Sequence, residues 1–205
     1  MKIIKRTIIN VGVIFGGIYR FTSPLVTKIA SWLYTGMIMK KFAKFGHNSV
    51  ISNKALRLEG CQYIYIGSNS VIREKVQLTA WQINNNNPKI SIGNNCCIRE
   101  GAHISAINYV IIKDHVLTGT NVLISDNSHG TNQRCELDLP PIERKIASKG
   151  GIIIEENVWI GNNACILGNV KIGKGAIIGA NAVVTHDIPA YSIAVGVPAK
   201  VLVKS

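Results

Sequence analysis

Histidines are the side chains of this 205-residue chain best suited to transfer protons, and there are five of them. An imidazole titrates at about pH 6.5, so it can take a proton from a weak nucleophile and later release it. One of the five, His129, lies where a regular sequence repeat stops and a long insertion begins. The others, His47, His103, His115 and His186, occupy a turn or positions within the repeat. His129 is therefore the histidine that the repeat singles out as a candidate for chemistry.

The repeat has a period of six residues and begins at Ile66. A period of six fits neither the 3.6-residue turn of a helix nor the plain alternation of sandwich strands. The second position of the hexad is often glycine, which suits a corner with positive φ, and the fifth is usually small. We therefore predict a parallel β-helix with three hexads per coil. Its inward positions are Ile66, Ile72, Leu78, Ile92, Ile98, Ile104, Ile112, Thr118, Ile124, Ile154, Ile160, Ile166, Ile172, Ile178 and Val184.

Three interruptions break the repeat, and with three hexads per coil all of them fall at the same corner. The longest separates Ile124 from Ile154 and contains a loop excursion over residues 130–151. Insertions that stack on one edge of a solenoid usually build a functional face. We therefore expect His129 to face a site at this corner.

Basic residues are concentrated at the N-terminal end of a chain whose net charge is +12. We expect residues 1–60 to form a basic, apolar helical segment that leads into the coil, and residues 61–202 to form the β-helix domain. Within the first part, residues 25–45 have the pattern of an amphipathic helix. Its apolar stripe is predicted to cap the open end of the coil. Peripheral membrane contact through residues 1–45 is the alternative. The stripe comprises Leu25, Ile29, Trp32, Leu33, Met37 and Phe42.

Several other classes of protein fit the sequence poorly. The apolar stretch from Thr7 to Tyr19 is well short of the roughly 20 residues of a spanning helix, and no signal-peptide cleavage site follows it. The basic charge lacks the motifs of nucleic-acid-binding folds, so no nucleic-acid partner is expected. Five cysteines without a CxxC pair favour a reducing compartment. We expect a cytoplasmic protein, or one at the inner membrane surface if the N-terminal segment binds lipid.

Three motifs carry a resemblance to a known family. They run from Ser125 to Gly130, from Asn157 to Gly161, and from Gly179 to Leu202. Together they resemble the hexapeptide-repeat acyltransferases, which include galactoside, maltose and polysaccharide O-acetyltransferases. The likeness covers residues 66–202, and the basic, apolar N-terminus is similar to the branch that modifies capsule and O-antigen.

This resemblance implies a left-handed coil, a homotrimer with active sites between neighbouring coils, and acetyl-CoA as co-substrate with no metal required. It implies that His129 takes the proton of an acceptor hydroxyl, whose oxygen then attacks the thioester. Asp126 is the candidate to orient the imidazole. The family pattern also implies cofactor-binding residues, although His186 stands where relatives usually carry lysine, which would weaken a phosphate contact there or make it pH-dependent. These residues are Trp159, Asn162, Ala180, Thr185, His186 and Lys200.

The expected function is therefore acetyl-CoA-dependent O-acetylation of a sugar or polysaccharide hydroxyl. Acyl transfer to an amino sugar or another small acceptor stays open, as does a non-catalytic scaffold with a basic, membrane-facing N-terminus. A γ-type carbonic anhydrase uses a similar coil but needs three converging histidines, and no other histidine lies within ten residues of His129. A sugar nucleotidyltransferase would need a nucleotide-binding domain ahead of the coil, for which the first 60 residues are too few.

Overall fold

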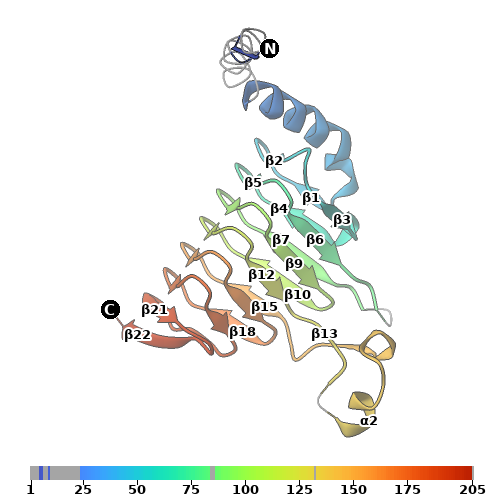
Figure 1. The fold of residues 1–205 in the computed structure, drawn as a ribbon, viewed down its shortest axis with the longest axis vertical. Coiled ribbons are helices and arrows are strands. Elements are labelled where there is room, and N and C mark those ends of the chain that lie inside the picture. The colour runs from blue at the N-terminus through green and yellow to red at the C-terminus, as the bar shows by residue number, and fades with distance from the viewer. Residues whose placement is uncertain (1–4, 7–8, 10–23, 84–85, 132, 205) are drawn as a thin grey trace.

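A computed structural model describes residues 5–6, 9, 24–83, 86–131 and 133–204. The chain winds into a parallel β-helix whose three sheets run along the coil (Figure 1). The first sheet contains β1 (Lys44–Phe45), β4 (Ile64–Ile66), β7 (Lys89–Ile92), β10 (Tyr109–Ile112), β15 (Ile152–Ile154) and β18 (Val170–Ile172). The second contains β2 (Val50–Ile51), β5 (Val71–Ile72), β8 (Cys97–Ile98), β11 (Leu117–Thr118), β16 (Trp159–Ile160), β19 (Ile177–Ile178), β21 (Ser192–Val195) and β22 (Lys200–Lys204). The third contains β3 (Arg57–Glu59), β6 (Gln77–Ala80), β9 (His103–Ala106), β12 (Leu123–Ser125), β17 (Cys165–Leu167) and β20 (Val183–Val184).

The mainly β, parallel fold predicted from the repeat is confirmed. Strands already form at Lys44, ahead of residue 61, where the repeat predicts the β-helix domain to begin. Short 3-10 helices lie between the longer elements. The first, η1 (Met39–Lys41), directly follows the N-terminal helix, and η2 (Cys61–Tyr63) lies at the corner between β3 and β4. The third, η3 (Pro141–Glu143), lies within the excursion. No helix in the described part of the chain is long and apolar enough to cross a bilayer.

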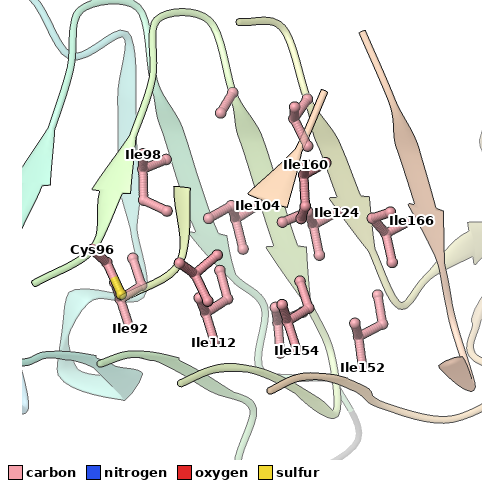
Figure 2. Close-up of a cluster of buried hydrophobic side chains, with 14 of the residues drawn as sticks. Ile92, Cys96, Ile98, Ile104, Ile112, Ile124, Ile152, Ile154, Ile160 and Ile166 are labelled. Carbon is pink, nitrogen blue, oxygen red and sulfur yellow. The ribbon is translucent and has the colours of Figure 1, made fainter. Parts of the chain in front are cut away.

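The core is a column of aliphatic side chains inside the coil. Every inward repeat position is at most 1% exposed, and Figure 2 shows isoleucines from all three sheets stacked in the interior. The one polar member, Thr118, has its hydroxyl oxygen 2.9 Å from the backbone N–H of Arg99, which donates to it. Because that hydrogen bond satisfies the hydroxyl, a buried threonine can replace an aliphatic residue here.

The glycines at the second hexad position have a different role from the one predicted. None of the six adopts positive φ; that conformation falls instead on the fourth position, usually asparagine, as at Asn69 and Asn163. The glycines allow close approach between successive coils. A Cβ at Gly161 would lie 2.5 Å from the backbone nitrogen of Ala180, and one at Gly67 would lie 2.6 Å from backbone atoms of Gly93.

Replacing Gly161 with alanine should therefore lower the free energy of unfolding by about 1–3 kcal/mol, because the backbone of the next coil must move. Gly36→Ala is the matched control, since a Cβ there meets nothing within 4 Å. That change lies in an exposed helix and should be neutral or stabilise the chain by up to about 1 kcal/mol. Denaturant unfolding of both variants measures the difference, and equal effects would contradict the close-approach role.

The N-terminal helix spans residues 24–38, so it ends earlier than the predicted residue 45. It does cover the open end of the coil, but with Ser31, Thr35 and the partly buried Tyr34 and Ile38 rather than with the predicted stripe. The Thr35 hydroxyl accepts the backbone N–H of Ile51 at 2.9 Å, and the Ser31 hydroxyl accepts that of Asn53 at 3.3 Å. The end of a coil presents unpaired backbone groups, which require hydrogen bonds rather than apolar contacts.

The predicted packing of the apolar stripe on the coil is therefore wrong for all but one of its members. Phe42 is buried in the core, but the other five are between 43% and 72% exposed: Leu25, Ile29, Trp32, Leu33 and Met37.

Candidate active site

All three interruptions of the repeat lie at the corner between the third and first sheets, as predicted. The longest joins β12 to β15 and projects away from the coil (Figure 1). It contains α2 (Arg134–Leu137) and η3, and its two ends pair as antiparallel strands β13 (Ser128–His129) and β14 (Ile146–Ala147). This pairing anchors the base of the excursion beside the coil.

His129 lies in β13, opposite Ile146 of β14. The next residue, Gly130, has φ of 81° and donates its N–H to the carbonyl of Lys145 at 2.8 Å, which extends the strand pairing. The His129 side chain is exposed, and no residue of the described chain hydrogen-bonds its imidazole. The strand pairing and the Gly130 hydrogen bond thus hold the backbone at His129 in place, while both nitrogens of its ring stay available to a ligand.

Asp126 is buried, with 1% exposure, and its carboxylate is fully engaged. One oxygen accepts the N–H of Ile107 at 2.9 Å and the other accepts that of Asn108 at 2.8 Å. The Asn127 amide donates both to Asp126 at 3.1 Å and to the Ser105 hydroxyl at 3.0 Å. Asp126 therefore ties the start of the excursion to the turn between β9 and β10. Among the described residues it has no hydrogen bond to His129, so its contacts support the backbone that leads to the imidazole.

The Ser105 hydroxyl and His103 were not singled out by the repeat analysis. Both point from the outer face of the third sheet, where His103 Nε2 lies 3.4 Å from the Thr79 hydroxyl. Burial, and to a lesser extent the positive charge of Arg57, lowers the pKa of His103 below that of an ordinary imidazole. The one signal in the sequence that could have placed Ser105 and His103 together is their spacing of two residues along β9, which puts them on the same face of the strand.

Two of the predicted cofactor-binding residues lie at the same corner as the excursion. Thr185 and His186 are in contact, with 2.8 Å between the Thr185 hydroxyl and His186 Nδ1. They line a pocket of about 580 Å³ together with Lys149, from the end of the excursion, and Lys171 of β18. The pocket therefore combines a hydroxyl, an imidazole and the Lys149 ammonium with the Asp187 carboxylate, while the Lys171 ammonium lies 3.3 Å from the Glu155 carboxylate.

The other four predicted cofactor-binding residues lie elsewhere on the coil. Trp159 is half exposed on the second sheet, and Lys200 is exposed at the start of β22. Asn162 and Ala180 form the corner between the second and third sheets, where the Asn162 side-chain oxygen accepts the N–H of Thr120 at 2.9 Å. A single chain thus does not bring the six residues into one site.

No group of three His, Cys, Asp or Glu side chains in the described part of the chain is arranged to hold a metal ion. The five cysteines are free thiols. The groups present at the corner are suited to proton transfer and to binding an anion.

Residues 151–186 match the family described as bacterial transferase hexapeptide (six repeats). These residues of the coil therefore resemble a transferase hexapeptide repeat. The hexapeptide-repeat acyltransferase fold implies a left-handed β-helix, as predicted. Among curated relatives, the putative lipopolysaccharide biosynthesis O-acetyl transferase WbbJ of Escherichia coli K12 is 33% identical over 119 residues. The match covers 56% of this chain and 60% of WbbJ, so this chain spans less than two thirds of that relative.

Solved structures share the hexapeptide coil. The N-acyltransferase AntD of Bacillus cereus, in complex with dTDP and coenzyme A, superposes with a TM-score of 0.66 at 23% identity, over 79% of this chain and 83% of AntD. The hexapeptide-repeat acetyltransferase VCA0836 of Vibrio cholerae, in complex with acetyl coenzyme A, has a TM-score of 0.52 at 21% identity, over 82% and 74% of the two chains. At these identities the likeness establishes the fold.

Proposed function

We propose that this chain transfers an acetyl group from acetyl-CoA to a hydroxyl of a sugar or polysaccharide, with His129 as general base. The observation that carries the proposal is the exposed imidazole on a backbone-paired hairpin, at the corner where every insertion stacks. The likeness to WbbJ supports O-acetyl transfer. The free thiols of all five cysteines agree with a cytoplasmic location, where acetyl-CoA is available.

His129 supplies the step that a sugar hydroxyl cannot perform alone, because a neutral hydroxyl is a weak nucleophile. The imidazole takes the hydroxyl proton as the oxygen forms its bond to the thioester carbonyl carbon. The carbon–sulfur bond then breaks, and the imidazolium returns the proton to the departing thiolate. The pairing of β13 with β14 holds the His129 backbone in place, so little ordering is needed when the acceptor binds.

The corner pocket has the chemistry to bind part of acetyl-CoA, which supplies the acyl thioester. Lys149 and His186 can face its phosphates, with the lysine acting as a point charge, whereas the Lys171 ammonium is paired with Glu155. The more distant Trp159, Asn162, Ala180 and Lys200 belong, in this proposal, to the same site contributed by a neighbouring copy. A homotrimer would explain why the predicted cofactor-binding residues lie on separate faces of one chain. The mass of the protein measured in solution should then be three times the mass of one chain.

Transfer to an amino sugar is the second candidate. AntD, an N-acyltransferase bound to dTDP and coenzyme A, shares this fold, and a general base serves an amine as well as a hydroxyl. The bond in the product separates the two candidates, since an ester is cleaved by alkaline hydroxylamine and an amide is not.

The proposed function is tested by offering acetyl-CoA and a panel of sugars, amino sugars, nucleotide sugars and lipid-linked oligosaccharides to the purified protein. Ester products from hydroxyl acceptors are the expected result. Amide products alone would replace the proposal with the second candidate. If no acceptor is acetylated and acetyl-CoA gives no protection against heat denaturation, the chain is a scaffold instead.

A further inference from the structure

The N-terminal helix has an outer face whose described side chains are almost all apolar and exposed. Its opposite face is held to the coil by Ser31 and Thr35, so the outer face points away from the coil. The side chains on this outer face are between 40% and 72% exposed; they are Leu25, Val26, Ile29, Trp32, Leu33, Met37 and, in η1, Met39. Apolar side chains scattered singly over a surface need no explanation, but a continuous apolar helix face indicates a binding surface.

Cations border this outer face. Lys28 lies over the Trp32 ring, with its Nζ 5.1 Å from the ring centroid, and Lys40 and Lys41 are exposed at the other end of the helix. The first 45 residues of the sequence contain eight Lys and Arg and no Asp or Glu. A helix with an apolar face, flanking lysines and a tryptophan at the boundary has the composition of an interfacial membrane helix.

A groove beside the helix adds to the positive charge. It has a volume of about 630 Å³ and lies between the helix and the second sheet, with Lys28, Lys54 and Arg73 in its lining. Its one acidic residue, Glu74, lies 3.5 Å from the Lys54 ammonium and so is already paired. The Lys54–Glu74 pair is neutral overall, so Lys28 and Arg73 are the cations that the groove offers to a phosphate at the edge of the apolar face.

Charge complementarity decides between the surfaces that could cover this face. A second copy would bring the same lysines face to face, and the first 23 residues are themselves basic without an acidic residue. An anionic lipid surface offers both negative charge and an apolar layer. We propose that the helix and η1, residues 24–41, dock on an anionic bilayer surface, with the apolar face in the lipid boundary and the lysines among the headgroup phosphates.

The location of the helix allows this docking without hiding the candidate active site. Figure 1 shows the helix across the N-terminal end of the coil, with β21 and β22 at the opposite end and the excursion at the side. A bilayer at the N-terminal end would leave the corner that carries His129 open along the side of the coil. An acceptor anchored in the same membrane would then need to reach that corner from the bilayer.

Flotation of the purified full chain with lipid vesicles tests the proposal. The chain should float with vesicles that contain phosphatidylglycerol and should not float with vesicles of phosphatidylcholine alone. Exchanging Leu33 and Met37 for serine should lower the partition coefficient of the chain into these vesicles by about a hundredfold. Each exchange removes the free energy of transferring one apolar side chain into lipid, which is worth roughly tenfold. Exchanging Lys28, Lys40 and Lys41 for glutamine should lower it by a similar factor, roughly fivefold per lysine.

A matched control uses two exposed apolar residues outside the helix. Ile142→Ser with Leu202→Ser removes side chains that are 82% and 64% exposed, and partition should stay unchanged. Equal loss in this control, equal flotation with both kinds of vesicle, or no flotation of the unmodified chain would overturn the proposal. A change in solution mass when Leu33 and Met37 become serine would also overturn it, because the face would then join proteins.

Trp32 provides an independent readout. Exchanging Trp81 and Trp159 for phenylalanine leaves it as the only tryptophan of the chain. Its emission should shift to shorter wavelength when vesicles containing phosphatidylglycerol are added, because the ring enters the boundary of the lipid layer. Unchanged emission on vesicles that the chain binds would place the contact elsewhere and overturn the assignment of the face.

Discussion

His129→Ala should lower the rate of acetyl transfer by about 10² to 10⁴ and leave the fold intact. The loss is expected because the proposed mechanism makes the His129 imidazole the group that takes the acceptor proton, whereas His186 at the same corner contacts the Thr185 hydroxyl. The fold should survive because no described residue hydrogen-bonds the ring and β13 pairs with β14 through its backbone. The rate is measured with acetyl-CoA and the acceptor identified by the panel, alongside the midpoint of thermal unfolding.

His103→Ala is the control for this variant. His103 lies on the third sheet with its imidazole near Thr79, and the proposed mechanism gives it no proton to carry. Its removal should change the transfer rate far less than the removal of His129. A His129→Ala chain that keeps more than about a tenth of the activity would remove the base assignment.

Asp126→Ala should lower the free energy of unfolding by about 2–4 kcal/mol. The change leaves the N–H groups of Ile107 and Asn108 without their acceptor in a buried turn, and each unsatisfied group costs about 1–3 kcal/mol. Activity should fall as well, because the backbone that leads to His129 loses its anchor. Denaturant unfolding measures the stability, and Asp138→Ala, at an exposed carboxylate, should cost no more than about 0.5 kcal/mol.

Asp126→Asn separates a supporting role from direct action on the imidazole. An amide keeps one acceptor oxygen, so it should restore part of the stability and activity that alanine loses. The pH dependence of the transfer rate should keep its shape in this variant, because the Asp126 carboxylate hydrogen-bonds to backbone N–H groups and to Asn127 rather than to the imidazole. A shifted pH profile with native stability would show instead that the carboxylate acts on the imidazole.

The repeat predicted the coil well because the sequence period alone decides which side chains face inward. The inward repeat positions from Ile66 to Val184 are all buried. The insertions share a corner, since three hexads return the chain to the same sheet. The glycine positions were predicted correctly but for the wrong reason. A repeated glycine indicates that a side chain cannot be accommodated at that position. The sequence does not show whether the cause is a positive φ angle or the close approach of the next coil, and only the packed structure distinguishes the two.

The orientation of the N-terminal helix could not be predicted from its pattern. An apolar stripe shows which residues share a face, but not what lies against that face. The end of the coil presents backbone groups at Ile51 and Asn53 that need hydrogen bonds, so Ser31 and Thr35 face it and the stripe points outward.

The candidate site was predictable only in part. The break in the repeat placed His129 at the correct corner, but its pairing with Ile146 joins two ends of a long excursion that follows no periodicity. The backbone N–H groups that donate to the Asp126 carboxylate come from the turn at Ile107 and Asn108 in the preceding coil. Spacing along the chain does not reveal this contact.

The release of free coenzyme A thiol, with and without acceptor, tests the central claim most directly. The unmodified chain should release thiol from acetyl-CoA only when a carbohydrate acceptor is present, in equal amount to the ester formed. The His129→Ala chain should bind acetyl-CoA with unchanged affinity and release almost none. Equal release by both chains, or none from the unmodified chain with any acceptor, would contradict the account.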